Sequence, residues 1–207
     1  MTEKLLDYMK AHELLKRNGI NALRAVYVKS AGEAIKFSAG RPIVLKVISD
    51  KALHKTKSGV IKLGLSNNRE ITTAYNELER KATALKPYKI LAQDMVRNGL
   101  EIIVGGNTDA QFGKMVLLGL GGIYVETFKD FALRVCPITR TDAESMIDQL
   151  KSGKVIAPNN KERRMLVGLL LNVSRMLMKN HDISELDLNP VILHGQGYDA
   201  VDLRIIT

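Results

Sequence analysis

Two neighbouring stretches combine residue types that bind phosphate. Lys46 interrupts an apolar segment, 43–48, and the polar stretch HKTKSGV follows at 54–60. An ammonium group on a strand that lines a cleft binds phosphate as a point charge, and backbone N–H groups beside a glycine form an anion-binding nest. The alternative for Lys46 is a lysine at a strand edge, extended into water. The stretch does not contain the Gly-x-x-x-x-Gly-Lys-Ser/Thr pattern of a Walker A loop.

A second group of polar residues lies near the C-terminus, in SELDLNPVILHGQGYDAVDLRI. If this segment is a hairpin with a two-residue turn at 195–196, Asn189 lies opposite Asp202. The same register places Asp187 opposite Arg204. Cross-strand neighbours have Cβ atoms about 4.5–5.5 Å apart. An amide oxygen and a carboxylate that converge in this way suit Mg²⁺, which takes few protein ligands.

The turn length decides whether this site exists. A three-residue turn over 195–197 would shift the register by one and move Asp202 to the other face. On pattern alone, a solvated polar face with one Asp–Arg pair is the commoner arrangement on a hairpin.

The elements that carry these residues alternate between helix and strand. A helical stripe of leucines ends at Gly19. Candidate helix caps are Ser30 and either Asn67 or Asn68, and Thr141 to Glu144 has the pattern of a capping box. The expected helices cover 5–19, 30–40, 70–84, a segment from 141, and 161–179, and the expected strands cover 25–29, 43–48, 60–65, 90–96, 101–104, 115–118 and 131–136, followed by the C-terminal hairpin.

This order predicts an α/β or α+β protein with two lobes. Lys86-Pro87 is the expected seam, which gives an N-terminal lobe at 1–88 and a C-terminal lobe at 89–207. The turn Gly119-Leu-Gly-Gly122 does not match the dinucleotide fingerprint, because Tyr124 stands in place of the third glycine. A Rossmann nicotinamide enzyme is therefore disfavoured.

The amino-acid composition indicates which classes of partner this chain can bind. The 207 residues include 31 Lys+Arg and 22 Asp+Glu, a net charge of +9, which favours an anionic partner. The basic residues are scattered and tryptophan is absent, so a nucleic-acid surface is disfavoured. The longest apolar stretch, 115–125, contains three glycines and is too short to span a membrane, and no targeting signal is recognised. The one cysteine, Cys136, favours a reducing cytoplasmic location and reads as a packed thiol.

Taken together, the chain resembles the β subunit, the nucleotide-binding subunit, of the ADP-forming acetyl-CoA synthetases, which are ATP-grasp relatives of succinyl-CoA synthetase. The stretches that carry the resemblance keep the family's order and cover most of the chain: PIVLKVIS at 42–49, HKTKSGV at 54–60, GLEIIVGGNTDAQFGK at 99–114, LLGLGGIYVETFKD at 117–130, ELDLNPVI and VDLRI. The resemblance implies an ATP-grasp fold whose two lobes clasp a nucleotide.

The resemblance also implies a reaction and a partner. Acyl-CoA, ADP and phosphate become free acid, CoA and ATP, reversibly. A CoA-binding α subunit carries the first phosphohistidine, and this chain passes the phosphoryl group to Mg-ADP. The expected state is a hetero-oligomer that needs both subunits for activity.

Individual residues take roles from the resemblance. Lys46 matches the lysine that holds nucleotide phosphates, and Ser58 and Gly59 fall on the loop over the phosphates. His54 matches a histidine that resembles a second phosphoryl carrier. Neutral imidazole is a nucleophile near pH 7. The alternative for His54 is a hydrogen-bond donor to phosphate and nothing more.

The remaining matches concern nucleotide and metal. Gln93 to Val96, including Met95, match the segment whose backbone meets adenine, and Glu101 matches the residue that accepts the ribose hydroxyls. Asn189 and Asp202 match the residues that bind Mg²⁺ in the family. Asp187 matches an acidic position near the arriving phosphohistidine, and Glu126 matches a glutamate whose role stays open.

Two departures from the family pattern bear on activity. Ser58-Gly59 stands where the family commonly has Gly-Gly, and 151–160 lacks the family's Gly-x-Arg-Gly element. They motivate a second hypothesis, a nucleotide-sensing or scaffolding subunit that binds nucleotide without catalysis.

Overall fold

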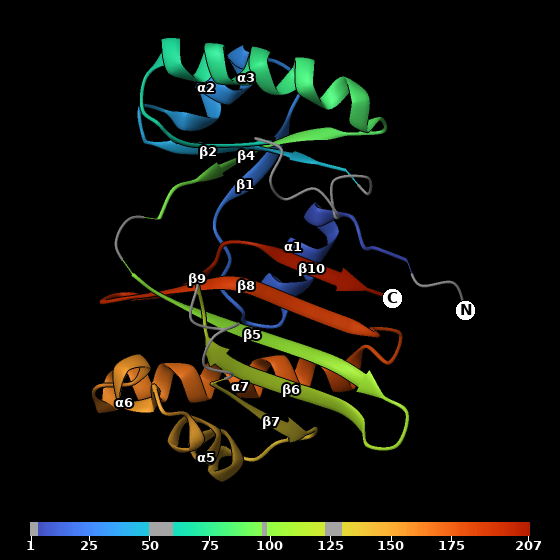
Figure 1. Cartoon of the computed structure of the whole chain (residues 1–207), viewed down its shortest axis with the longest axis vertical. Coiled ribbons are helices and arrows are strands. Elements are labelled where there is room, and N and C mark those ends of the chain that lie inside the picture. Colours follow the sequence, from blue (N-terminus) through green and yellow to red (C-terminus); the bar gives the residue numbers. More distant parts are fainter. Residues whose placement is uncertain (1–3, 50–59, 97–98, 123–129) are drawn as a thin grey trace. The chain divides into compact units, whose positions relative to one another are not determined.

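The computed structural model describes residues 4–49, 60–96, 99–122 and 130–207 (Figure 1). It divides the chain into two compact units. One unit is Leu23–Arg97, and the other combines Met1–Ala22 with Asn98–Thr207. Each unit contains its own antiparallel sheet.

The first unit is a four-stranded sheet with helices on one face. Its strands follow the order β1-β4-β2-β3. The core lies between one face of the sheet and the two α-helices, where Leu45, Ile71 and Leu78 are fully buried. The elements are β1 (Ala25–Val28), α2 (Ala31–Ser38), β2 (Ile43–Ile48), β3 (Ile61–Leu65), α3 (Asn68–Ala82), the 3₁₀ turn η2 (Thr83–Leu85) and β4 (Lys89–Asp94).

The helix starts in this unit follow the sequence. The Ser30 hydroxyl accepts a hydrogen bond from the Glu33 N–H at 3.2 Å, and the Asn67 side chain accepts one from the Glu70 N–H at 2.9 Å. Such caps satisfy backbone donors that the first helical turn leaves without partners. Both expected caps are confirmed, with Asn67 chosen over Asn68.

The second unit holds the larger sheet. Its strands follow the order β10-β8-β5-β6-β7, with β9 paired to β8. Helices α5 and α7 cover one face (Figure 1). The elements are α1 (Tyr8–Arg17), β5 (Leu100–Asp109), β6 (Gly113–Leu120), β7 (Phe131–Val135), α5 (Arg140–Gln149), α6 (Gly153–Ile156), α7 (Asn160–Lys179), β8 (Glu185–His194), β9 (Gly197–Ala200) and β10 (Leu203–Ile206).

The division between units differs from the expected boundary after residue 88. β4 belongs to the N-terminal sheet, because it pairs with both β1 and β2. The first residues belong with the C-terminal unit, because Leu5 bridges to Ile206 and the Leu6 N–H donates to the Ile205 carbonyl at 2.9 Å. Leu5 and Leu6 therefore extend the sheet edge instead of beginning a helix, and Asp7 caps α1.

Two local expectations are also corrected. The capping box of α5 is formed by Thr139 and Asp142, two residues before the predicted position, because both reciprocal hydrogen bonds occur there. The strand expected at 101–104 is longer than predicted. β5 runs to Asp109, whose carboxylate accepts hydrogen bonds from the Gln111 and Phe112 N–H groups and so closes the turn.

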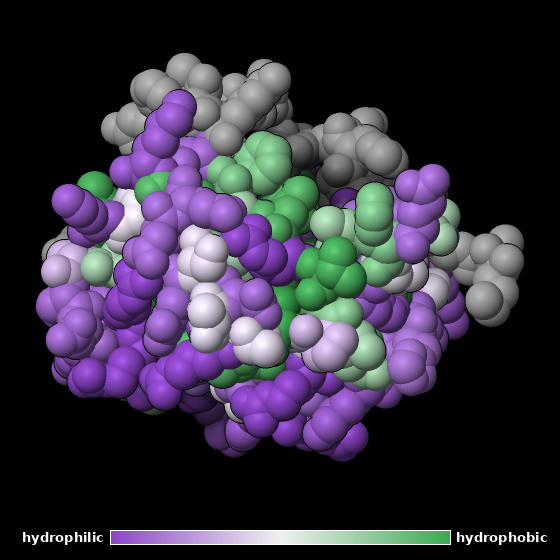
Figure 2. Space-filling view, turned by 90° about the horizontal axis from the view of Figure 1, so that it is seen from below, coloured by the Kyte–Doolittle hydropathy of each residue, from purple (hydrophilic) through white to green (hydrophobic). Residues whose placement is uncertain are grey.

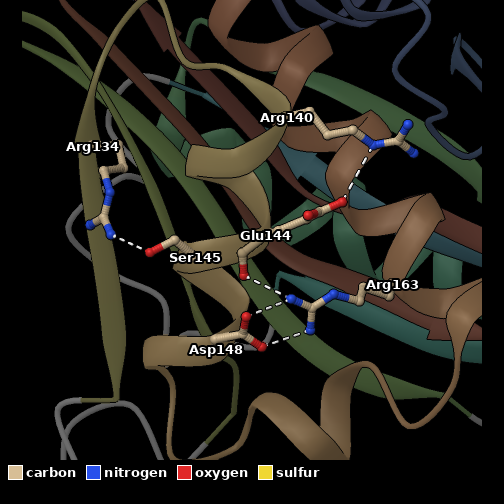
Figure 3. Close-up of polar contacts among 6 residues, drawn as sticks. All are labelled: Arg134, Arg140, Glu144, Ser145, Asp148 and Arg163. Atoms are coloured by element: carbon tan, nitrogen blue, oxygen red, sulfur yellow. Dashed lines mark hydrogen bonds and ion pairs between the residues drawn. The ribbon is translucent and has the colours of Figure 1, made fainter.

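Arginine contacts hold α5 against its neighbours (Figure 3). Arg163 on α7 donates two hydrogen bonds to the Asp148 carboxylate, at 2.7 and 2.6 Å, and Arg134 on β7 donates to the Ser145 hydroxyl at 3.0 Å. On α5 itself, Arg140 lies 3.4 Å from Glu144. These contacts fix α5 to a strand on one side and a helix on the other.

The atypical stretch 151–160 is ordered. The Asp130 carboxylate accepts hydrogen bonds from the Lys151 and Ser152 N–H groups at 2.8 and 2.9 Å, and the short helix α6 follows. A Cβ at Gly153 would lie 2.3 Å from the Ile147 carbonyl oxygen, so the close packing of α6 on α5 requires glycine here. The departure from the family pattern is therefore compatible with a folded segment.

Figure 2 views the molecule from the side of the α5 and α7 layer. Hydrophilic side chains dominate this face, with a band of hydrophobic side chains near its centre. The hydrophilic majority is what amphipathic helices present when they turn their apolar stripes toward a sheet. Among the described residues, no helix combines the length and the apolar character needed to cross a membrane.

Candidate functional site

Lys46 lies on an interior strand, not at a sheet edge. β2 pairs with β4 on one side and with β3 on the other, and Lys46 stands opposite Leu91 and Ile61. Its flanking residues Leu45 and Val47 face the helices in the core, so strand alternation turns Lys46 to the helix-free face. Only 5% of Lys46 is exposed. The alternative of a water-exposed edge lysine is therefore excluded.

Gln93 shares that face of the sheet. It stands opposite Val44 on β2, two residues from Lys46, and 1% of it is exposed. Because antiparallel partners point to the same face, Lys46 and Gln93 place an ammonium and an amide on one buried surface. Together with the position of Lys46 on an interior strand, this makes the helix-free face of the sheet a candidate ligand surface.

The segment after Gln93 is tied down by a residue that the sequence did not single out. Arg24 donates to the two Asp94 carboxylate oxygens at 2.9 and 2.8 Å and stacks 4.0 Å from the Phe37 ring centroid. The Asp94 N–H donates to the Arg24 carbonyl, and the Met95 N–H donates to the Pro42 carbonyl at 3.3 Å. No sequence signal links Arg24 to Asp94, because 70 positions separate them.

Glu101 is placed by glycines on both sides. The Gly121 N–H donates to the Glu101 carbonyl at 2.8 Å, and a Cβ at Gly121 would lie 2.8 Å from the Glu101 carbonyl carbon. A Cβ at Gly99 would lie 2.5 Å from the Leu193 carbonyl oxygen. Glycine at position 99 therefore allows the start of β5 to pack closely on β8. Glycine at position 121 allows the chain after β6 to pack on the Glu101 backbone. The exposed Glu101 side chain is held on this framework.

We expect Gly121→Ala to weaken both folding and nucleotide binding. The added methyl meets backbone atoms of Glu101, which have little freedom to move, so the free energy of unfolding should fall by about 1–3 kcal/mol. Glu101 should be displaced, which lowers the affinity for Mg-ADP measured by calorimetry. The matched control is Gly168→Ala on α7, where nothing lies within 4 Å of the new Cβ. That variant should gain roughly 0.5–1 kcal/mol and bind nucleotide normally; equal losses in both variants would contradict the role given to Gly121.

The C-terminal hairpin has the two-residue turn. Val191 pairs with Ala200 and His194 with Gly197, so only 195 and 196 lie in the turn. Asp187 stands opposite Arg204, as predicted. The Asn189 N–H donates to the Asp202 carbonyl at 3.3 Å. The predicted register is confirmed, and the three-residue turn is excluded.

Asn189 lies at an irregularity in its strand. Ile102 pairs with Val191 and Val104 with Leu188, so two residues of β8, Asn189 and Pro190, stand opposite one residue of β5. This is a β-bulge, which re-aims a side chain and often lies next to functional sites. Asn189 is exposed there, while its partner Asp202 lies in the break between β9 and β10. The amide and the carboxylate sit where both strands depart from regular pairing.

The Asp187 carboxyl lies beside other acidic groups. Burial raises its pKa, and the neighbouring Glu185 and Asp202 carboxylates raise it further, while the Arg204 guanidinium lowers it. Arg204 itself lies 3.7 Å from the Glu185 carboxylate. The surface around Asp187 therefore carries an excess of negative charge that a bound cation would relieve.

Comparison with known proteins identifies the family. The family described as an ATP-grasp domain matches residues 1–207. The chain is 34% identical, over 95% of its own length and 89% of the relative's, to the β subunit of acetate–CoA ligase (ADP-forming) I of Pyrococcus furiosus. This chain belongs to the ATP-grasp family, among the β subunits of ADP-forming acetyl-CoA synthetases.

Two solved structures bear out the ATP-grasp fold. One is the dinucleotide-forming acetyl-coenzyme A synthetase 1 of Candidatus Korarchaeum cryptofilum in complex with coenzyme A and Ca-AMPCP, with a TM-score of 0.89 and 34% identity over 99% of this chain and 93% of that one. The other is the same enzyme with coenzyme A and Mg-AMPPCP, its phosphohistidine segment pointing towards the nucleotide binding site. It has a TM-score of 0.84 and 34% identity over 98% of this chain and 92% of that one.

The ATP-grasp hairpin fits a magnesium ion by the chemistry of its donors. Asn189 and Asp202 offer one amide and one carboxylate oxygen, and Mg²⁺ prefers a small number of oxygen ligands with phosphate and water completing its shell. The neighbouring Asp187 adds negative charge nearby. Over the described ranges, no cluster of three or more His, Cys, Asp or Glu residues offers a competing metal site.

Several predicted residues of this ATP-grasp chain lie outside the described residues. These are His54, Ser58, Gly59 and Glu126, and their assignments stay predictions.

The cysteine and one histidine are placed in the second unit. Cys136 is buried, and burial raises the pKa of its thiol, so the expectation of a packed thiol is confirmed. His194 lies on β8. It is half-buried, and its Nε2 lies 3.0 Å from the Asp199 carboxylate, because the hairpin turn brings the two side chains together.

Proposed function

We propose that this chain is the nucleotide-binding subunit of an ADP-forming acyl-CoA synthetase and transfers a phosphoryl group from phosphohistidine to Mg-ADP, reversibly. The observation that supports the proposal is the hairpin register, in which the Asn189 N–H donates to the Asp202 carbonyl and Asp187 stands opposite Arg204. A solvated polar hairpin has no need of a bulge at Asn189 or of a half-buried carboxylate at Asp187.

Nucleotide binding would draw on several described residues. The Lys46 ammonium would bind the phosphates as a point charge, and the Glu101 carboxylate would accept the ribose hydroxyls. Adenine would meet the backbone after Gln93. Because the Asp94 and Met95 N–H groups already donate within the first unit, other backbone groups of this segment would recognise the base.

The transfer step would depend on charge placement more than on proton transfer. Asn189 and Asp202 would hold Mg²⁺, which when bound neutralises the phosphate oxygens. Asp187 would accept a hydrogen bond from the imidazole of the arriving phosphohistidine and so orient the ring. His54 would act as the second phosphoryl carrier, with Ser58 and Gly59 over the phosphates.

A partner subunit follows from the same proposal. The two relatives from Pyrococcus furiosus are named as β subunits, and we propose an α subunit that binds CoA, forms acyl phosphate and carries the first phosphohistidine, in a cytoplasmic hetero-oligomer. The acyl selectivity would then belong to the partner.

The deciding experiment is reconstitution with the α subunit from the same source. Acetyl-CoA, ADP, phosphate and Mg²⁺ should yield ATP, and chelation of the metal should stop ATP formation. ADP binding measured by calorimetry without any ATP formation would instead favour the nucleotide-sensing or scaffolding subunit. Salt-sensitive binding of DNA or RNA, without Mg²⁺-dependent binding of ADP, would reject both.

A further inference from the structure

Arg204 and Asp187 face each other across two strands, yet their charges do not pair. The residues are direct partners in the register of β10 and β8. Within the part of the chain that the structure describes, the closest carboxylate to the Arg204 guanidinium is that of Glu185, at 3.7 Å, which is too long for a hydrogen bond. The Arg204 Nε is buried and has no hydrogen-bond partner.

Two other arginines of this chain behave differently. Arg24 and Arg163 each bind a carboxylate through two hydrogen bonds, with distances between 2.6 and 2.9 Å. This bidentate geometry is the usual way in which a guanidinium is satisfied in a folded protein. Arg204 has a carboxylate directly opposite and does not adopt it. A buried donor without an acceptor costs free energy. The unsatisfied Arg204 Nε therefore indicates that Arg204 binds a ligand during the reaction.

The surroundings of Arg204 show what kind of group this is. The carboxylates of Glu185 and Asp202 lie close enough to act on the Asp187 carboxyl, and the three groups would repel a phosphoryl group. A guanidinium on the same face offers a planar fork of N–H donors that matches phosphate oxygens. An anion with several acceptor oxygens, held next to Asp187, would use the donors that the resting protein leaves unused.

We propose that Arg204 binds the phosphoryl group while it passes between the carrier histidine and the nucleotide. The inference rests on the proposed function. In the transfer, the N–P bond of the phosphohistidine breaks and its electron pair stays on the imidazole nitrogen. A β-phosphate oxygen of the nucleoside diphosphate forms the new P–O bond. Arg204 exchanges no proton, and it stabilises the charge spread over the three oxygens of the moving group.

The test follows a single transfer in the reconstituted complex. The α subunit is phosphorylated from acetyl-CoA and phosphate, Mg-ADP is added, and the loss of phosphohistidine is timed. Arg204→Met should slow the transfer by roughly 10³-fold, the lower end of what an arginine contributes to phosphoryl transfer. The affinity for Mg-ADP, measured separately by calorimetry, should stay close to that of the wild type, because the nucleotide itself is held elsewhere.

Glu185→Gln is the matched control. It removes the carboxylate nearest to Arg204, and it should slow transfer less than about fivefold, because an ion pair this long and exposed contributes little. If Arg204 served only to balance Glu185, the double variant Arg204→Met/Glu185→Gln would recover the wild-type rate. That recovery would overturn the proposal, and so would an unchanged rate in Arg204→Met.

A third variant covers the case in which Arg204→Met does not fold. Arg204→Lys keeps the charge but loses the planar fork, and it should remain at least about tenfold slower than the wild type; a wild-type rate there overturns the proposal. The two levels of failure are distinguishable. A wild-type complex that transfers no phosphoryl group rejects the proposed function together with this role, whereas normal transfer in the arginine variants rejects this role alone.

Discussion

Lys46→Met is expected to lower ATP formation by the reconstituted complex by roughly 10²–10³-fold, the usual loss when one charged or polar donor to a transition state is removed. The reason is positional. Lys46 lies on an interior strand and is 5% exposed, so neither water nor a neighbouring exposed lysine replaces its ammonium. Methionine has a similar length and no charge, so the variant removes the ammonium and keeps most of the side-chain volume.

The control for Lys46→Met is Lys89→Met. Lys89 lies on the adjacent strand β4, opposite Ile48 and therefore on the same face, but it is exposed and stacks 4.4 Å from the Tyr27 ring centroid. Its removal takes away the same charge from the same sheet and should leave ATP formation nearly unchanged. Comparable losses in both variants would mean that net charge, not the position of Lys46, governs the reaction. Unchanged ATP formation in Lys46→Met would reject its assigned role.

His54→Ala is expected to stop ATP formation while sparing the first half of the reaction. If His54 is the second carrier, the α subunit still takes up phosphate from acetyl-CoA and inorganic phosphate, and phosphorylated α subunit accumulates. Denaturing gels run at neutral to alkaline pH, where the N–P bond of phosphohistidine survives, separate the two subunits, and radiolabelled phosphate shows which one holds the label. In the wild type the label should pass through this chain before it reaches ADP.

The matching control for His54→Ala is His181→Ala, which removes an exposed imidazole from the second unit. It should leave both half-reactions intact. Normal ATP formation in His54→Ala would reject the relay. Slow ATP formation with no label on this chain in the wild type would favour the simpler role, in which His54 only donates a hydrogen bond to phosphate.

Local sequence predicted the parts of the fold that depend on neighbouring residues. The helix caps Ser30 and Asn67 and the long helix α7 are determined within a few positions of the chain. The hairpin register belongs to the same class, because a two-residue turn determines every cross-strand pair that follows it. For this reason the opposition of Asn189 and Asp202 was predictable without a structure.

Distant pairings were not predictable in this way. Nothing near β4 in the sequence shows that it completes the N-terminal sheet, and nothing near Leu5 shows that it joins Ile206 at the edge of the second sheet. The difference in the domain boundary follows from this. Pro87 before a strand is typical of a boundary between lobes, whichever sheet the strand joins. The capping box of α5 was misplaced because two Thr-x-x-acid patterns overlap there, and local spacing does not choose between them.

By itself, the sequence determined the family, the candidate phosphate-binding lysine and the register that pairs an amide with a carboxylate. These depend on residue type, order and the period of the strand, which are written in the chain. Only the tertiary structure decided that Lys46 is interior, that Gly121 serves the placement of Glu101, and that Arg204 leaves Asp187 unpaired. The burial of a side chain, the close approach of two backbones and the distance between two opposite charges depend on segments that are far apart in the sequence. No local sequence pattern encodes them.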